Sequence, residues 1–287
     1  MSVVLRNVCY TYMQGTPFER MALKEISLEI QPGEFVAVAG HTGSGKSTLM
    51  QHLNGLLKPM AGTVSVDGVD LQAKGAAAKA ARRKVGMVFQ YPEQQLFEET
   101  VFADIAFGLR NLALAEADVE ERVQKAMEFV GLDFATYKDV SPFQLSGGQM
   151  RRVAIAGVIA LQPAYLVLDE PSAGLDPRGR DALFAKIRDL HKKTKIAVVL
   201  VSHNMDDIAR LAKRLVVLRQ GEILVDAAAR EAFQQVEHLQ SAGLDVPQVT
   251  ALLELLRKKG LPVEAEASTP AQAAEAIAAA MRRRKKC

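Results

Sequence analysis

A glycine-rich segment near the start of the chain constrains the fold more than any other feature. It follows the apolar run 35–39 and precedes the apolar run 49–53, so a buried strand turns there into a helix whose amino end can face an anion. The segment fills every position of the phosphate-loop pattern with Gly40, His41, Thr42, Gly43, Ser44, Gly45, Lys46, Ser47 and Thr48. In this pattern Lys46 reaches the β- and γ-phosphates of a nucleoside triphosphate, and the Ser47 hydroxyl binds Mg²⁺. The segment therefore predicts an α/β fold that binds ATP and Mg²⁺.

Length and composition set the size of that fold. The 287 residues, of which 49% are hydrophobic, can form one large α/β domain and a smaller appendage. The longest apolar run, Val153 to Leu161, is too short to span a bilayer, which needs about twenty residues. The first residues do not resemble a signal peptide. The two cysteines, Cys9 and Cys287, are interpreted as reduced thiols, although a disulfide between them stays open.

The charge of the chain gives little support to a nucleic-acid partner. The formal net charge is only +3, and the basic residues at 282–286 suit the carboxyl end of a helix. We expect that segment to be a solvated helix end and expect no nucleic acid as a partner. Contact of the segment with a membrane surface remains the alternative.

Hydropathy patterns divide the chain into four parts. Alternating residues at 3–8 and 26–30 predict an antiparallel β portion, and short strands are predicted at 63–68 and 85–89. Continuous apolar runs at 166–168, 197–201 and 215–218 predict parallel strands that are covered on both faces. Residues 91–161 are mainly helical and predict a helical subdomain within a nucleotide-binding domain of residues 1–225. Helical patterns at 229–243, 247–259 and 270–286 predict a C-terminal module of residues 226–287, which either mediates an interaction or packs on the core.

Two further motifs carry chemistry. The strand at 165–170 ends in Asp169, which can hold Mg²⁺ through water, and Glu170, which can orient or deprotonate an attacking water molecule. The alternative is that both acids cap a helix before Pro171. The segment 145–149, Leu-Ser-Gly-Gly-Gln, would open a helix with uncovered N–H groups and so form a second anion site.

In their order, these motifs resemble those of the ATPase subunits of ATP-binding cassette (ABC) transporters, and the resemblance covers about residues 1–225. The family pattern also falls on Gln90, on the D-loop 172–176 and on His203. The resemblance implies a P-loop ABC-type core with an antiparallel β subdomain, an inserted helical subdomain and a small C-terminal helical module. It also implies a head-to-tail pair of subunits, in which each ATP lies between the phosphate loop of one subunit and the signature residues of the other. Those signature residues are Ser146, Gly147, Gly148 and Gln149.

The same resemblance assigns roles to single residues. Glu170, His203 and Gln90 are the expected catalytic residues, with His203 contacting the γ-phosphate and helping to hold Glu170 and the water. Ser47, Gln90 and Asp169 are the expected Mg²⁺ ligands. Tyr12 is the expected aromatic on which adenine stacks, and Tyr10 is the alternative.

A finer resemblance is to the energy-coupling factor group of vitamin and metal-ion importers. It rests on Gln90–Phe97, on Thr16–Glu19 and on the helical tail, and the segments His41-Thr42 and 17–19 resemble the second of two paralogous ATPases. It implies a peripheral protein on the cytoplasmic face of the membrane. The expected partners are a paralogous ATPase subunit, a transmembrane coupling subunit and exchangeable membrane substrate-binding subunits; a homodimer remains open. We expect Glu93, Glu98 and Glu99 to border the docking groove, and the tail helices to add to the dimer contact.

Other functions would use many of the same residues. The chain could be the ATPase of a cobalt or nickel importer. A soluble cassette ATPase of DNA repair or translation would usually carry a coiled-coil insertion or a second cassette, and a kinase would need an acceptor site and would not use the signature. The transported solute is not encoded in this chain.

Overall fold

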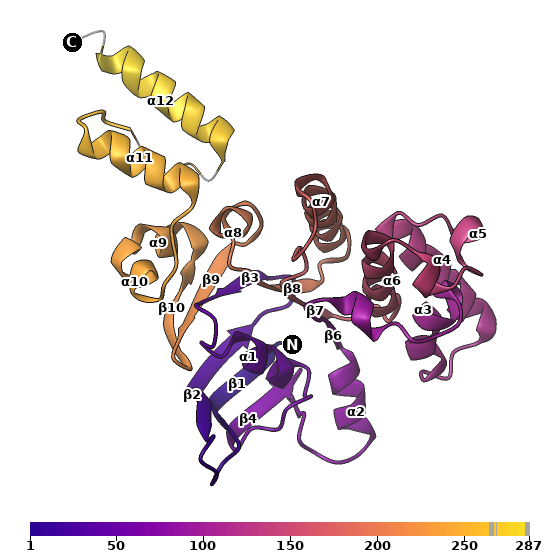
Figure 1. The fold of residues 1–287 in the computed structure, drawn as a ribbon. Helices are drawn as coiled ribbons and strands as arrows, with labels where there is room; N and C mark the ends of the chain where they lie inside the picture. The colour runs from indigo at the N-terminus through magenta and orange to yellow at the C-terminus, as the bar shows by residue number, and fades with distance from the viewer. Residues whose placement is uncertain (264–266, 268, 285–287) are drawn as a thin grey trace.

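The computed structural model describes residues 1–263, 267 and 269–284, and it contains two β-sheets surrounded by helices (Figure 1). The first sheet is antiparallel in the order β2-β1-β4-β5. The second has the order β10-β9-β3-β8-β7-β6 and is parallel except for β10 at its edge. The strands are β1 Val3–Tyr12, β2 Arg20–Ile30, β3 Phe35–Ala39, β4 Ala61–Val66, β5 Val69–Asp70, β6 Val85–Val88, β7 Tyr165–Asp169, β8 Ala197–Val201, β9 Arg214–Arg219 and β10 Glu222–Ala228.

The central parallel strands are buried along their whole length. Every residue of β3, β7 and β8 is buried, as their continuous apolar runs predicted. Alternate residues of β3 face two different cores: Ala37 packs with the helices, whereas Val36 and Val38 pack with the antiparallel sheet. The position of β3 between these cores fixes the point at which the phosphate loop leaves the sheet.

Helices cover the parallel sheet from both sides. In Figure 1, α7 (Pro177–Thr194) and α8 (Met205–Leu211) lie on one face of it, and α1 (Lys46–Leu53) lies between the two sheets. Residues Leu49, Met50 and Leu53 of α1 are buried in the core that the two sheets share. The predicted fold class, a P-loop α/β core with an antiparallel β subdomain, is confirmed.

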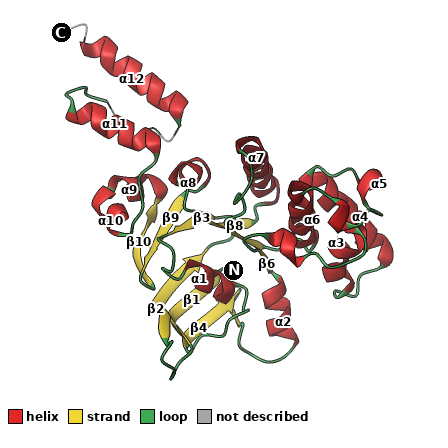
Figure 2. Ribbon diagram, viewed as in Figure 1, coloured by secondary structure: helices red, strands yellow, loops and turns green. Residues whose placement is uncertain are grey.

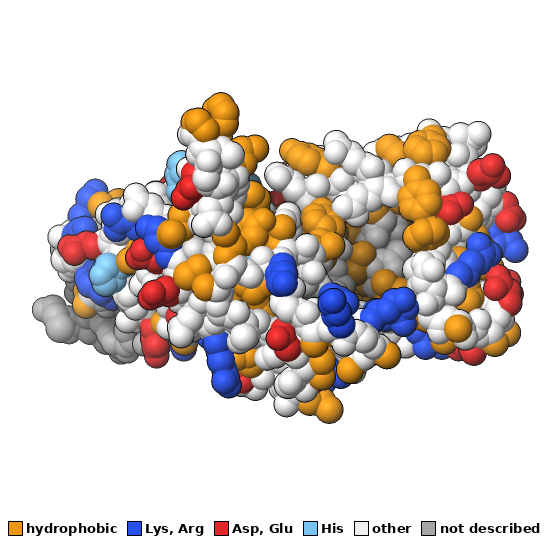
Figure 3. Space-filling model, turned by 90° about the horizontal axis from the view of Figure 1, so that it is seen from below, with side chains coloured by type: hydrophobic (Ala, Val, Ile, Leu, Met, Phe, Trp, Pro, Cys, Tyr) orange, Lys and Arg blue, Asp and Glu red, His pale blue; other side chains and the backbone are white. Residues whose placement is uncertain are grey.

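A helical lobe follows β6 and α2 (Ala76–Arg83), at the right of Figure 2. It contains α3 (Val101–Arg110), α4 (Glu116–Val130), α5 (Phe134–Tyr137) and α6 (Gly147–Ala160), together with 3₁₀ turns at Pro92–Gln95 and Pro142–Gln144. The buried residues of α3, α4 and α6 form one continuous core with the parallel sheet. A hollow separates this lobe from the antiparallel sheet on the face shown in Figure 3, where acidic and basic side chains are interspersed with hydrophobic ones.

The C-terminal helices form two pairs with different surroundings. Helices α9 (Ala229–Gln234) and α10 (Val236–Ser241) bury Phe233 and Leu239 in the main core. Helices α11 (Gln248–Lys258) and α12 (Pro270–Arg284) bury a small cluster of their own that contains Leu253 and Ala273. The prediction of one helical stretch from 229 to 243 was wrong in detail. The chain leaves helical geometry at Gln235 (φ −86°, ψ 56°), and the bend lets both short helices bury an apolar side chain in the same core.

Three other expectations concern the start of the C-terminal helices, the two cysteines and membrane-spanning helices. Strand β10 continues to Ala228, so the helices begin at Ala229. Cys9 is a free cysteine, whereas Lys285, Lys286 and Cys287 lie outside the described residues. Within residues 1–263, 267 and 269–284, no helix has both the length and the apolar character that crossing a bilayer requires.

Candidate functional site

The phosphate loop joins β3 to α1 through backbone that only glycine can adopt there. Gly40 has φ 153° and Gly45 has φ 106°. A Cβ atom would lie 2.3 Å from the Leu218 carbonyl oxygen at Gly40, and 2.5 Å from the Ala22 carbonyl oxygen at Gly45. Side chains at these positions would therefore push the loop away from β9 and β2. The glycines therefore let the loop pack tightly on both sheets at the amino end of α1, where backbone N–H groups can bind an anion.

Lys46 lies within this loop as a half-buried cation. Its Nζ atom donates hydrogen bonds to the carbonyl oxygens of Gly40 (2.7 Å) and His41 (3.1 Å). Burial lowers the pKa of Lys46, and the nearby carboxylates of Glu170 and Asp169 oppose that shift. The amine therefore sits where it can exchange carbonyl partners for phosphate oxygens.

Two acids end β7 at the same edge of the sheet. Asp169 is buried, and burial raises its pKa, while a hydrogen bond with Ser47 and the charge of Lys46 oppose the rise. Glu170 adopts φ 48°, a conformation that costs a non-glycine residue free energy and that often marks a functional position. The Glu170 carboxylate lies 2.8 Å from Nδ1 of His203, whose side chain is 78% exposed. The strained backbone thus turns Glu170 toward the histidine that follows β8.

These groups line one cavity at the carboxyl edge of the parallel sheet. Its volume is about 770 Å³. The predicted site residues that line it are Gly40, His41, Thr42, Gly43, Lys46, Ser47, Gln90, Asp169, Glu170 and His203. Because β3, β6, β7 and β8 are parallel, segments distant in sequence meet at this edge, which is where open α/β sheets bind ligands.

Tyr12 lies beside the helix that the loop opens. Its ring is 38% exposed, and its hydroxyl is 3.2 Å from Oγ1 of Thr48. Tyr10 is partly buried and packs edge-on against both Tyr12 and the buried His52. Of the two tyrosines, Tyr12 therefore has more ring surface available to a stacking partner.

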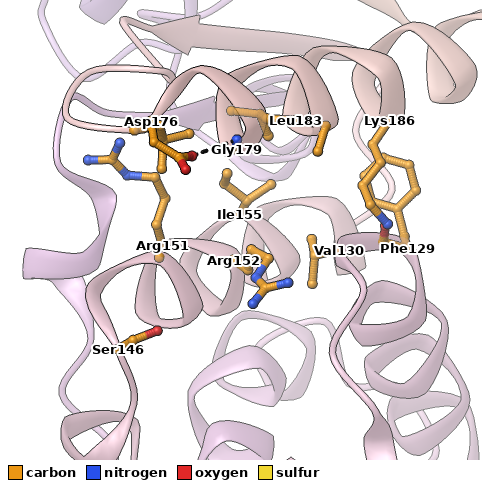
Figure 4. Close-up of a pocket in the computed structure, with 13 residues that line it drawn as sticks. Phe129, Val130, Ser146, Arg151, Arg152, Ile155, Asp176, Gly179, Leu183 and Lys186 are labelled. Carbon is orange, nitrogen blue, oxygen red and sulfur yellow. Dashed lines mark hydrogen bonds between the residues drawn. The ribbon is translucent and has the colours of Figure 1, made fainter.

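The signature segment lies in a different cavity. Ser146 caps α6: its Oγ accepts a hydrogen bond from the N–H of Gln149, and the Gln149 side-chain oxygen accepts one from the N–H of Ser146. The helix therefore begins at Gly147, and the Gln149 side chain also donates a hydrogen bond to the Tyr137 hydroxyl. The cavity has a volume of about 310 Å³ and lies between α6 and α7, with Ser146 and Asp176 at its edge (Figure 4).

The two cavities have no lining residue in common. Ser146 and Gly148 line the smaller one, and the phosphate loop lines the larger. A Cβ atom on Gly147 or Gly148 would meet no atom of the described residues within 4 Å. The structure therefore does not bring the signature to the phosphate loop of the same chain.

The sequence analysis missed Arg151. This side chain is only 6% exposed and donates two hydrogen bonds of 3.0 Å to the Glu93 carboxylate, and another to the Ala173 carbonyl oxygen. It thus connects α6 to the 3₁₀ turn after Gln90 and to the D-loop. The Glu93 carboxylate, which we expected to border a docking groove, is held by Arg151 of the same chain, and its place in a docking groove stays a prediction. The available signal was an arginine beside the apolar run that begins at Val153.

The sequence analysis also missed the segment between α10 and α11. Gly243, Leu244, Asp245, Val246 and Gln248 line the larger cavity opposite the phosphate loop. No periodicity or motif marks these residues, so the sequence offered no signal for them.

The donors of the larger cavity fit a nucleoside triphosphate with Mg²⁺. The glycine loop supplies N–H groups, Lys46 supplies a cation, and the buried Ser44 hydroxyl has no hydrogen-bond partner among the described residues. Ser47 and Asp169 supply the oxygen atoms that Mg²⁺ prefers. Among the described residues, no group of three or more His, Cys, Asp or Glu side chains could hold a metal by itself.

Comparison with known proteins identifies the class. The family model described as ABC transporter matches residues 23–173, which is more than half of the chain, and the chain belongs to this family of ATPases. One similar solved structure is the dimeric post-hydrolysis state of the ATP-binding cassette MJ0796 bound to ADP and Pi. It has a TM-score of 0.71 to this chain and 30% sequence identity, and the match covers 79% of this chain and 99% of that one.

The relatives narrow the family. The energy-coupling factor transporter ATP-binding protein EcfA2 of Clostridium perfringens is 54% identical over 96% of this chain and 97% of its own length. EcfA2 of Clostridioides difficile is 49% identical over 100% of both chains. The structure of cbiO1 from Clostridium perfringens, part of the ABC transporter complex cbiONQ, has a TM-score of 0.72 and 34% identity, and the match covers 88% of this chain and 98% of that one. Within the ABC family, the chain belongs to the energy-coupling factor transporter ATP-binding proteins.

Proposed function

We propose that this chain hydrolyses ATP as one of two ATPase subunits that power the uptake of a vitamin or another micronutrient. The observation that carries the proposal is the arrangement of Glu170 and His203, 2.8 Å apart, at the same cavity edge as Lys46, Ser47 and Asp169. Phosphoryl transfer to water needs an acidic side chain, a cation and oxygen ligands for Mg²⁺, and this edge of the sheet supplies all three.

In this proposal the residues of the phosphate loop bind the substrate. The N–H groups of the loop and the Lys46 amine hold the β- and γ-phosphates of ATP, and Tyr12 stacks on adenine. Ser47, Asp169 and Gln90 hold Mg²⁺, which would neutralise part of the phosphate charge. Because these groups lie on the rigid carboxyl edge of the sheet, they fix the γ-phosphate relative to Glu170.

Glu170 and His203 then act on water. One oxygen of the Glu170 carboxylate accepts a hydrogen bond from the attacking water, while His203 Nδ1 holds the carboxylate in place. The water oxygen bonds to the γ-phosphorus as the bond to the bridging oxygen of ADP breaks, and the proton of the water passes to Glu170. The products are ADP and inorganic phosphate.

The signature needs a second subunit in this proposal. Ser146, Gly147 and Gly148 lie in a cavity separate from the phosphate loop, and the two glycines have open space before them. Their N–H groups, with Gln149, would grip the γ-phosphate bound by the partner. ATP binding then closes the pair, and hydrolysis, which leaves two charged products between the faces, opens it.

We further infer the partners and location from the relatives. The names of the EcfA2 relatives favour an energy-coupling factor transporter over a cobalt or nickel importer, since those proteins are up to 54% identical, against 34% for cbiO1. The proposed partners are a paralogous ATPase, a transmembrane coupling subunit and membrane substrate-binding subunits. The chain would sit on the cytoplasmic face of the membrane, and Glu93, Glu98 and Glu99 are the proposed residues at the border of the docking groove.

The catalytic proposal is tested with two variants and a control. Glu170→Gln should retain ATP binding but lose turnover, because the amide accepts the water proton poorly. Lys46→Ala should weaken ATP binding itself. Glu120→Gln, an exposed position on α4, serves as the control and should change neither quantity. Normal turnover in Glu170→Gln would contradict the assigned role.

The transport proposal is tested by affinity purification from detergent-solubilised native membranes, with mass spectrometry of the bound proteins. A second ATPase and an integral membrane protein should copurify at stoichiometric levels. Recovery of the chain alone, from a soluble fraction, would refute this part while leaving the ATPase assignment intact.

A further inference from the structure

The segment 243–248, which we call the connecting segment, joins the two pairs of C-terminal helices and forms one wall of the ATP cavity. Five of its residues line that cavity together with the phosphate loop, Glu170 and His203. In the chain it leads directly into α11, whose apolar side packs with α12 rather than with the main core. The nucleotide cavity and the terminal helix pair are therefore adjacent structures.

The connecting segment is anchored rather than loosely placed. Leu244 is only 6% exposed and belongs to the main core cluster. At the end of the segment, the N–H of Gln248 donates a 3.0 Å hydrogen bond to Oδ1 of Asp206, three residues after His203. Just before it, the Arg219 side chain at the end of β9 donates to the Ser241 hydroxyl at 3.2 Å. A movement of the connecting segment would therefore be transmitted to the loops around it.

Gly243 contacts the phosphate loop at His41. Gly243 has φ +70°, and a Cβ atom there would lie 3.2 Å from Cδ2 of His41 and 3.6 Å from its Cβ. A distance of 3.2 Å is closer than ordinary van der Waals contact, so the absence of a side chain at 243 lets the His41 ring lie where it does.

His41 is the residue on which the loop conformation depends. Its carbonyl oxygen accepts hydrogen bonds from the Lys46 amine (3.1 Å) and from the N–H of Ser44 (3.1 Å), and its Nδ1 lies 3.0 Å from the Thr42 carbonyl oxygen. A displacement of the His41 side chain that also moved its backbone would shift this carbonyl oxygen, which is a hydrogen-bond acceptor of Lys46. The contact at Gly243 thus reaches the main phosphate-binding cation through one residue.

We propose that the connecting segment is a positioning element of the ATP site, in which Gly243 sets the phosphate loop through His41. This inference rests on the proposed ATPase function and deepens it. The coupling works in both directions, because a contact that changes ATP affinity must itself respond to ATP. ATP binding at the loop therefore alters the stability of α11, which begins at the end of the connecting segment.

The test compares two glycines of similar backbone but different surroundings. Gly260 has φ +83°, and a Cβ atom there would meet no described residue within 4 Å, so Gly260→Ala introduces the same backbone strain without the contact to His41. We expect Gly243→Ala to weaken the binding of a fluorescent ATP analogue by about fivefold or more, and Gly260→Ala to leave it unchanged. The KM for ATP should rise more than kcat falls.

A double variant and an exchange measurement complete the test. His41→Ala combined with Gly243→Ala removes the obstructed ring, so the two substitutions should be non-additive in ATP affinity. Addition of ATP should change the hydrogen exchange of amides at 248–258 in the wild-type chain. Should Gly243→Ala fail to fold, Gly243→Asn and Gly260→Asn replace the alanine pair, because asparagine tolerates positive φ.

The outcomes separate the inference from the proposed function. Equal ATP affinity in Gly243→Ala and Gly260→Ala, whether normal or reduced, overturns the inference, as does exchange at 248–258 that ATP does not change. Failure of the wild-type chain to bind or hydrolyse ATP instead refutes the proposed function.

Discussion

Gly148 is a position where a methyl group should stabilise the chain and yet damage its function. It lies in the first turn of α6, and a Cβ atom there would meet nothing within 4 Å. Replacing a helical glycine by alanine without steric conflict stabilises a protein by roughly 0.5–1 kcal/mol, since alanine has less backbone entropy to lose. For a chain of this size we expect the melting temperature of Gly148→Ala to rise by about 1–4 °C.

In the proposed pair of subunits, the same methyl group would lie between the signature N–H groups and the phosphates bound by the partner subunit. Loss of that close approach should lower ATP hydrolysis by at least about tenfold, which corresponds to about 1.4 kcal/mol of activation free energy. ATP binding to the isolated chain should not change, because Gly148 does not line the larger cavity. A stabilised chain with a defect in hydrolysis alone is the expected result.

Gly157 in the same helix provides the matched control. A Cβ atom there would approach only the Ile105 Cα atom, at an ordinary 3.9 Å, so Gly157→Ala should stabilise the chain similarly and leave hydrolysis unchanged. Urea unfolding measures the stabilities, and phosphate release at saturating ATP measures turnover over a range of protein concentrations. Equal turnover in the two variants, or a clear destabilisation by Gly148→Ala, would refute the reasoning that another subunit fills the space.

Three further predictions concern packing and charge. Arg151→Met should destabilise the chain by about 3–5 kcal/mol in urea unfolding, because it leaves the Glu93 carboxylate without its partner. The double variant with Glu93→Gln should recover part of this loss. Additive effects of the two substitutions would contradict the ion pair. Gly86→Ala should cost about 1–3 kcal/mol, because its Cβ would lie 2.8 Å from atoms of the buried Pro163 and of the partly buried Val158. A loss below about 0.5 kcal/mol would argue against such tight packing. Desolvation raises the pKa of Asp67, but hydrogen bonds from Lys84 and from a tyrosine outweigh it and lower the pKa below 3.8. The ionised Asp67 therefore stabilises the fold at neutral pH, and this stabilisation is lost as the pH falls through the lowered pKa. The stability difference between wild type and Asp67→Asn should therefore shrink between about pH 5 and pH 2, and a difference independent of pH would be the contrary result.

The parts of the fold that could be predicted from the sequence are those with a local signal. The strand at 197–201 was predicted because a run of apolar residues records burial on both faces, and the structure buries every one of them. The phosphate loop was predicted because its glycines are required by local backbone geometry as well as by packing. Asp169 and His203 were assigned to one site through the resemblance to ABC ATPases, and in the structure the parallel strands β7 and β8 bring both residues to one edge.

The parts that could not be predicted depend on contacts between distant segments. The bend at Gln235 follows from where the core lies relative to α9 and α10, which no local pattern records. The partnership of Arg151 with Glu93 joins residues 58 positions apart, and each side chain alone suggests a solvent-exposed charge. The contact of Gly243 with His41 joins residues farther apart still and involves no periodic feature.

The position of β3 in the sheet has a consequence for how the protein is made. Strand β3 ends at residue 39, but its two neighbours, β8 and β9, begin at residues 197 and 214. At ordinary rates of protein synthesis, β3 leaves the ribosome about 8–30 s before its first neighbour does. During that interval this wholly apolar strand has no hydrogen-bonding partner from the sheet, so the nascent chain is vulnerable to aggregation there. Mutations that delay the folding of the last third of the chain, which contains β8 and β9, should consequently lower the yield of folded protein more than its final stability.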